Sequence, residues 1–420
     1  MTHSRPVDTA YEPVRVVLYS HDSQGLGHVR RNLSIAHHIA QTVPALTGRP
    51  VAGLLVSGLP HAAAFPLPAG FDWVFIPSVH KSKGEYASRS LGTTTKLLVK
   101  LRSQLLEASL LGFAPDVVII DRHIFGVMRE LQGPLATLRQ QHPKAHIVLG
   151  LREILDAPEV AHAEWYKNGD PEDLREVIDS LWIYGDPAIH HPVSSGEIPD
   201  VLADKARFTG YLALGRELTE PSGQAHPENP FILTTAGGGE DGFALLDTMV
   251  QVEPPAGYDH LVVTGPQLAA ERFHHLVERA APRVQVIHSL PGLSQLIGQA
   301  SAVVCMGGYN TTNEVLATDT PALIVPRETP RTEQLIRARA LAAAGVADYC
   351  RTADLTVERA RTWVTQATGR VVDRTHIERD GLWRTATLVA EILAAQPNNQ
   401  GAPTPSLTAP ITLQEDSWPA

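Results

Sequence analysis

Residues 303–339 read VVCMGGYNTTNEVLATDTPALIVPRETPRTEQLIRAR, and this stretch decides the fold. It begins with a short apolar run whose length and composition are typical of a buried parallel strand. The glycine pair at 307–308 follows at once, where we expect a helix to start with Asn310 or Thr311 as its cap. A second apolar run over 321–326 predicts the next strand. The stretch therefore alternates strand and helix around a glycine turn.

The glycine pair and the polar residues after it fit an anion bound beside a sugar. A helix start leaves backbone N–H groups unpaired and carries partial positive charge, and Gly307 and Gly308 let a phosphate approach the backbone closely. Glu314 would repel a phosphate, but it can accept hydrogen bonds from ribose hydroxyls. Glu333 and Gln334, which open the following helix, can bind the hydroxyls of a sugar. Taken singly, each residue also fits a tight turn or a solvated helix, whereas the ordered set favours a nucleotide-sugar site.

The stretch GGYNTTNEVLATDTPALIVPRETPRTEQ resembles the donor-binding region of GT-B glycosyltransferases, and most closely glycosyltransferase family 28. The resemblance is specific over about residues 230–350 and weaker elsewhere. It implies that Glu314 binds the donor ribose and that Glu333 and Gln334 bind the donor sugar. It also implies a UDP-sugar donor and an α/β fold of two Rossmann-like, doubly wound parallel-sheet domains that face each other across a cleft.

A second glycine-containing turn follows the first predicted strand, over 14–20. Gly25 and Gly27 lie in this turn, and His28 comes directly after it. The dinucleotide-binding fingerprint is incomplete here, because Arg30 occupies its third glycine position. Family 28 has a glycine-rich turn ending in Gly-His at this place, which implies an acceptor-side turn and a catalytic His28. The alternative is a helix-capping or core histidine.

Asp121 is the candidate partner of this histidine. It ends the predicted strand over 115–121, and ligands of open α/β sheets gather at the carboxyl ends of the strands. A carboxylate there can orient the imidazole of His28 and stabilise its protonated form. His123 lies close enough in sequence to serve as the base instead, and Asp121 also fits a simple helix cap.

The second half of the chain carries one more glycine-rich turn, directly after a predicted strand over 231–236. A turn of this kind can wrap a diphosphate together with the turn at 307–308. By resemblance, Leu290 lies in the segment that packs against the nucleobase. The residues assigned to the donor diphosphate are Gly237, Gly238, Gly239, Gly307, Gly308, Asn310 and Thr311.

Composition limits the class of protein. A chain of 420 residues with 43% hydrophobic composition can bury two cores. Its net charge of −10 argues against a general nucleic-acid binder. Two cysteines support neither a disulfide framework nor a zinc cluster, and no apolar N-terminal segment or membrane span is present in the sequence. We therefore expect a cytoplasmic protein without a transmembrane segment, and a peripheral membrane contact stays possible.

The domain boundaries follow the strand pattern and the proline-rich stretches. We expect an acceptor-side domain over 14–217, a linker over 218–230, and a donor domain over 231–380. A helix over 381–396 is expected to cross back to the first domain, and 397–420 reads as a disordered tail. The polar segment from His80 to Thr95 is expected to be a loop, which by analogy with GT-B enzymes faces the acceptor and alternatively is a plain surface loop.

The predicted function is inverting, metal-independent transfer of a sugar from a nucleoside diphosphate to an acceptor hydroxyl. The nucleotide-sugar is a co-substrate, so no separate cofactor and no metal are expected, and backbone N–H groups stabilise the leaving diphosphate. Two alternatives use the same donor residues: a UDP-sugar 2-epimerase, and a nucleotide-sugar-binding protein without a working base. Neither the sugar nor the acceptor, whether small molecule, glycan or lipid-linked, follows from the sequence.

Overall fold

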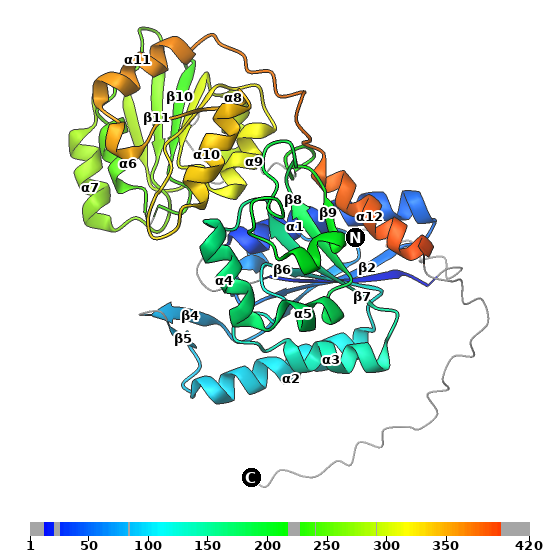
Figure 1. Cartoon of the computed structure of the whole chain (residues 1–420). Helices are drawn as coiled ribbons and strands as arrows, with labels where there is room; N and C mark the ends of the chain where they lie inside the picture. The colour runs from blue at the N-terminus through cyan, green and yellow to red at the C-terminus, as the bar shows by residue number, and fades with distance from the viewer. Residues whose placement is uncertain are drawn as a thin grey trace, which may run out of the picture.

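The structure is a computed structural model, and it describes residues 12–20, 26–82, 85–216, 227–239, 241–290 and 292–395. The chain forms two α/β bodies, each built on a parallel sheet (Figure 1). Among the described residues, no helix combines the length and the apolar character needed to cross a membrane.

The first sheet has seven strands in the order β3-β2-β1-β6-β7-β8-β9, and every pair is parallel. The chain builds outward from β1 through β2 to β3, returns, and adds β6 on the other side of β1. This reversal makes the carboxyl ends of β1 and β6 the point where a doubly wound sheet binds its ligands. The strands are β1 (Val14–Tyr19), β2 (Val51–Ser57), β3 (Phe71–Phe75), β6 (Val117–Asp121), β7 (His146–Arg152), β8 (Ser180–Tyr184) and β9 (Ala206–Phe208).

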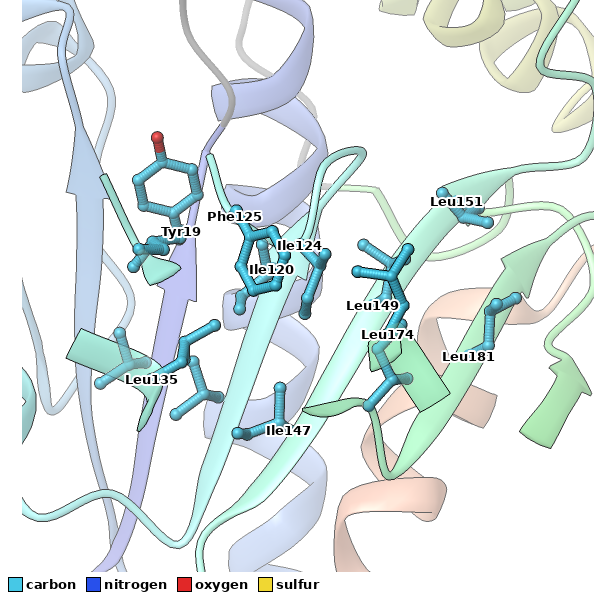
Figure 2. Packing of buried hydrophobic residues seen from close by; sticks show 14 of the residues in the cluster. Tyr19, Ile120, Ile124, Phe125, Leu135, Ile147, Leu149, Leu151, Leu174 and Leu181 are labelled. Carbon is cyan, nitrogen blue, oxygen red and sulfur yellow. The ribbon is translucent and has the colours of Figure 1, made fainter. Parts of the chain in front are cut away.

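The strands of the first sheet are apolar because both faces of the sheet are covered. Alternate residues of β6 point to opposite sides, so that Val118 and Ile120 join one core cluster and Val117 and Ile119 join another. Figure 2 shows the first of these clusters, with Ile120 among apolar side chains from neighbouring strands. The helices of this body are α1 (Gly27–Thr47), α2 (Thr95–Phe113), α3 (Gln132–Gln141), α4 (Pro158–Asn168) and α5 (Pro171–Val177).

The second sheet repeats this plan with six parallel strands in the order β12-β11-β10-β13-β14-β15. Its reversal lies between β10 and β13, which carry the two glycine turns at their carboxyl ends. The strands are β10 (Phe231–Thr235), β11 (Asp259–Val263), β12 (Val284–Ile287), β13 (Ala302–Cys305), β14 (Ala322–Ile324) and β15 (Asp348–Tyr349). The helices are α6 (Phe243–Met249), α7 (Ala270–Arg279), α8 (Leu293–Gln299), α9 (Tyr309–Leu316), α10 (Glu333–Ala343) and α11 (Val357–Ala367), and short 3-10 helices lie at Pro60–Ala64, Asp200–Lys205 and Thr352–Asp354.

The last helix, α12 (Gly381–Ala395), leaves the second body and packs along α1 of the first (Figure 1). Its buried face includes Leu382, Ala386 and Val389, which belong to the same cluster as the apolar face of α1. The chain crosses back at an isolated bridge between Leu212 and Asp380. This helix therefore ties the C-terminal part of the second body to the first sheet.

Two predictions of local structure are wrong. The segment expected to be a loop over 80–95 contains an antiparallel hairpin, β4 (Val79–Ser82) with β5 (Glu85–Ser88), and the start of α2. The cap of α9 is the backbone of Gly308, and neither Asn310 nor Thr311 caps it, because the helix starts earlier, at Tyr309. Most of the expected linker, the expected tail and Gly25 lie outside the described residues.

Candidate functional site

His28 and Asp121 meet at the reversal point of the first sheet. His28 lies in the first turn of α1, which follows β1, and Asp121 is the last residue of β6, the neighbour of β1. The His28 Nδ1 and Asp121 Oδ2 atoms are 2.6 Å apart. Because a carboxylate only accepts, this contact places the proton on Nδ1 and leaves Nε2 as the atom that can take a proton. The structure thus brings together the base and orienter expected from the sequence.

Arg31 completes this group, although it was not predicted from the sequence. Its Nη2 donates to both carboxylate oxygens of Asp121, at 2.7 and 2.6 Å, and its side chain is only 3% exposed. The guanidinium also lies over the ring of Tyr309, 5.3 Å from its centroid. A position three residues after His28 on the same helix places both side chains on one face, which is the signal that could have identified Arg31.

The charges of this group set its protonation. Burial acts to raise the pKa of Asp121, but the charges of Arg31 and then His28 outweigh it and hold that pKa well below its usual range. Burial lowers the pKa of His28 below its ordinary value, against the opposing effect of Asp121, and the charges of Arg31 and Arg152 lower it further. His28 is therefore neutral near pH 7, as a general base must be.

The residues just after Asp121 hold a strained turn. Arg122 has a positive φ of 74°, which a residue with a side chain rarely adopts, and its backbone N–H donates to Gly150. The His123 backbone N–H donates to the Asp121 carbonyl, and its side chain lines a cavity of about 20 Å³ under α4. That volume is about one water molecule. Of the two candidate bases, His28 is therefore the one in contact with the Asp121 carboxylate.

The two glycine turns of the second body lie side by side at the reversal point of its sheet. A Cβ added at Gly237, after β10, would lie 4.0 Å from Thr311 Oγ1 in the first turn of α9. Gly239 has a φ of 91°, and a Cβ there would come within 2.5 Å of the Thr264 carbonyl oxygen. Only glycine fits that position. Gly238 lies between them, so the segments assigned to the diphosphate converge on one edge of the sheet.

Glu314 points toward the first body. It is 5% exposed, and its Oε1 accepts a hydrogen bond from Arg30 Nη2 at 2.7 Å, while Arg216 Nη1 lies 4.0 Å away. Asn310, four residues earlier on α9, donates from Nδ2 to the Gly27 carbonyl at 3.1 Å. The N-terminal turns of α1 and α9 are therefore in direct contact.

Glu333 and Gln334 lie together around Arg327. Arg327 donates from Nη2 to Glu333 at 2.6 Å and from Nη1 to Asp241 at 2.7 Å, and its backbone N–H donates to Gln334. Glu333 is 4% exposed, and its Oε2 has no hydrogen-bond partner among the described residues. An acceptor atom buried without a donor is available for a ligand hydroxyl. Leu290 lies farther along the same edge, half-buried after β12.

Comparison with known proteins agrees with this geometry. Residues 237–368 match the glycosyltransferase family 28 C-terminal domain. The chain has the GT-B fold, and its second body resembles the C-terminal domain of glycosyltransferase family 28. No curated protein sequence matches the chain.

Solved structures similar to this chain share its fold at low sequence identity. MurG of Acinetobacter baumannii is 15% identical with a TM-score of 0.55, over 90% of this chain and 100% of that one. A UDP-glucosyltransferase from Polygonum tinctorium is 12% identical with a TM-score of 0.55, over 92% and 100%. VinC, solved in complex with dTDP, is 17% identical with a TM-score of 0.53, over 91% and 96%. At these identities the likeness concerns the fold alone.

Proposed function

We propose that this glycosyltransferase moves a sugar from a nucleoside diphosphate, with UDP favoured, to an acceptor hydroxyl, inverting the anomeric carbon and using no metal. The observation that carries the proposal is the contact between the two reversal points. The helix turn that bears His28 touches the helix turn that follows Gly308, through the hydrogen bond from Asn310 to Gly27. A base and a diphosphate site in such proximity fit direct transfer between two substrates.

In the proposed reaction, the acceptor hydroxyl attacks the anomeric carbon while Nε2 of His28 takes its proton. The bond from that carbon to the diphosphate oxygen breaks, and the diphosphate leaves with the electron pair. Asp121 stabilises the imidazolium that forms and keeps its ring oriented. Because attack comes from the side opposite the leaving group, one displacement inverts the configuration.

The donor site accounts for the remaining assignments. The turns at Gly237–Gly239 and Gly307–Gly308, with the first N–H groups of α9, would hold the diphosphate and stabilise its growing charge. Glu314 would bind the ribose after releasing Arg30, and Glu333 and Gln334 would bind the sugar. The dTDP in VinC and the donor in the name of the Polygonum enzyme support a nucleoside diphosphate of the pyrimidine type.

Calorimetric titration of UDP, dTDP and GDP into the wild-type protein and into Glu314→Ala tests the donor assignment. We expect one nucleotide to bind at micromolar strength and the substitution to cost on the order of 1–3 kcal/mol, as for a lost hydrogen bond to a charged group. Absence of binding by all three, or an unchanged affinity in Glu314→Ala, would contradict the donor site.

Turnover then tests the reaction itself. Sugar conjugates of the bound nucleotide are incubated alone and with a panel of hydroxyl-bearing acceptors, and nucleotide release is followed together with the anomeric configuration of the product. Acceptor-dependent release with inversion supports the proposal. Conversion of the donor without any acceptor would instead indicate epimerase chemistry, and a product of retained configuration would rule out the single displacement.

A further inference from the structure

Arg152 lies between the two bodies, and none of the described residues pairs with its guanidinium. It is the last residue of β7, and it lies beside Tyr184 of β8 at the carboxyl edge of the first sheet. Among the described residues, no hydrogen bond or ion pair reaches its side chain, and its Nε is buried without a partner. Arg152 is half-buried, and a charge partly withdrawn from water without a hydrogen-bonded counter-charge is costly, so its presence favours a ligand.

The other arginines around Arg152 each pair with a carboxylate, so the acidic residues nearby are already engaged. Arg337 is fully buried and donates from Nε to Glu153 at 2.6 Å, which leaves Glu153, the chain neighbour of Arg152, occupied. Arg122 and Arg331 share Glu164, each at 2.6 Å. The remaining pairs are Arg31 with Asp121 and Arg327 with Glu333.

Arg152 lies close enough to the proposed base and to a proposed sugar ligand to interact electrostatically with both. Its charge acts on His28, the proposed base, and the charge of Glu333, a proposed sugar ligand, acts on it in turn. Burial, and then the charges of Arg122 and Arg337, lower the pKa of Arg152 to about 9. With a pKa of about 9, the guanidinium is still charged at neutral pH. The residue therefore carries an uncompensated positive charge between the acceptor side and the sugar side.

We propose that Arg152 binds an anionic group, a carboxylate or a phosphate, that a substrate carries beside the point of transfer and that is distinct from the donor diphosphate. The proposal rests on the proposed function for its substrates. Arg152 belongs to the first body, whereas both turns assigned to the diphosphate belong to the second. A planar guanidinium with several donors binds such oxygen pairs in a bidentate manner. The anion can come from an acidic donor sugar or from an acidic acceptor.

Inorganic phosphate is the probe for this site, titrated into the full chain saturated with UDP. We expect Arg152→Gln to weaken phosphate binding at least about tenfold, as for a lost charge-assisted hydrogen bond, and Arg152→Lys to weaken it less. Arg279→Gln is the matched control, because Arg279 is an exposed arginine of α7 paired with Asp247 at 3.0 Å. Its phosphate affinity should equal that of the wild type.

The melting temperature separates a binding role from a structural one. Removing a half-buried charge that no described residue pairs with should leave Arg152→Gln as stable as the wild type or more stable in phosphate-free buffer. A structural arginine would instead lower the melting temperature on substitution. Equal phosphate affinity in wild type and Arg152→Gln, no phosphate binding by the wild type, or a clear loss of stability in Arg152→Gln would overturn the proposal.

A second titration identifies the substrate that carries the anion. UDP-glucuronate and UDP-glucose are each titrated into wild type and Arg152→Gln. A selective loss for UDP-glucuronate places the anion on the donor sugar, and equal affinities alongside a lost phosphate site place it on the acceptor. An equal loss for UDP itself would assign Arg152 to the diphosphate and overturn the proposal. If UDP fails to bind the wild type, the proposed donor is wrong, and phosphate titration of the nucleotide-free chain still tests Arg152.

Discussion

The two bodies have the same sheet plan but fill its reversal point in opposite ways. In the first body, the carboxyl ends of β1 and β6 carry His28 and Asp121, held by the buried guanidinium of Arg31. In the second, the ends of β10 and β13 carry glycine turns, with Gly237 close to Thr311. The carboxyl edge of the first sheet, called the first edge, presents titratable side chains. The carboxyl edge of the second sheet, called the second edge, presents backbone groups.

The difference corresponds to two chemical tasks. Moving a proton requires a side chain whose pKa is adjusted by its neighbours, and the Asp121–Arg31 pair does this for His28. Binding a diphosphate requires close approach to N–H groups, which side chains obstruct. The proposed acid–base centre and the proposed anion site therefore lie at the same kind of sheet edge, and substitutions at the two edges should change different observables.

The largest expected effect is a loss of turnover from substitutions at the carboxyl edge of the first sheet. His28→Ala should lower kcat by about 10²–10⁴-fold, the range for loss of a general base, with nucleotide affinity unchanged. Steady-state rates with the donor and acceptor found by screening, together with nucleotide calorimetry, give both numbers. His123→Ala is the matched control and should keep nearly full activity. A wild-type kcat in His28→Ala, or a large loss of kcat in His123→Ala, would indicate that His123 is the base.

The second edge can be tested with two neighbouring glycines. Gly308 has an ordinary φ of −60°, and a Cβ there would have nothing within 4 Å, whereas one at Gly307 would come within 2.6 Å of Ile324 Cγ2 at a φ of 76°. We expect Gly308→Ala to keep its fold and lose about tenfold or more in nucleotide affinity, because the methyl group obstructs the phosphate.

Gly307→Ala serves as the comparison for this experiment. It should lower the free energy of unfolding by about 1–3 kcal/mol, because alanine is strained at a positive φ. Calorimetry and denaturant unfolding of both variants separate the two effects. Unchanged nucleotide affinity in a folded Gly308→Ala would show that phosphate does not approach the start of α9.

The sequence predicted the parts of this site that depend on local pattern. Strand ends, glycine turns and their order along the chain place His28, Asp121 and the turn at Gly307 at the carboxyl edges, because parallel sheets fix which ends meet. Pairing between distant side chains does not follow from local pattern. Arg30 meets Glu314 across 284 positions, and nothing near either residue specifies that contact.

The sequence also could not predict which side chains lack a partner. Glu153 is the chain neighbour of Arg152, but its carboxylate pairs with Arg337 of α10, 184 positions away. The hairpin of β4 and β5 was also missed, because its polar composition is typical of a loop and its two short strands pair only with each other. In both cases contacts between residues distant in sequence determine the structure, and local sequence propensity does not.

Substitutions at the contact between the two sheet edges should change nucleotide affinity in opposite directions. Oε1 of Glu314 accepts a hydrogen bond from Arg30, so a ribose hydroxyl bound at that oxygen, as proposed, would compete with Arg30. Glu314→Gln should weaken nucleotide binding about 10- to 100-fold. Arg30→Gln should strengthen it by up to about fivefold, because Arg30 is 42% exposed and such pairs contribute less than about 1 kcal/mol. A loss of affinity in Arg30→Gln would mean that Arg30 itself binds the nucleotide.

The smallest expected effect is a displacement of the pH profile, and it tests whether the first edge works as a charged group. The acid limb of kcat/KM should lie below the ordinary histidine pKa, because burial and the charges of Arg31 and Arg152 lower the pKa of His28. Activity is present above that limb and lost below it, since only neutral His28 accepts a proton. Asp121 raises the pKa of His28, so Asp121→Asn should move the limb to still lower pH while the rate falls. A limb that moves to higher pH in Asp121→Asn would show that His28 is not the group that titrates. The first sheet edge would then not differ from the second by carrying a histidine base.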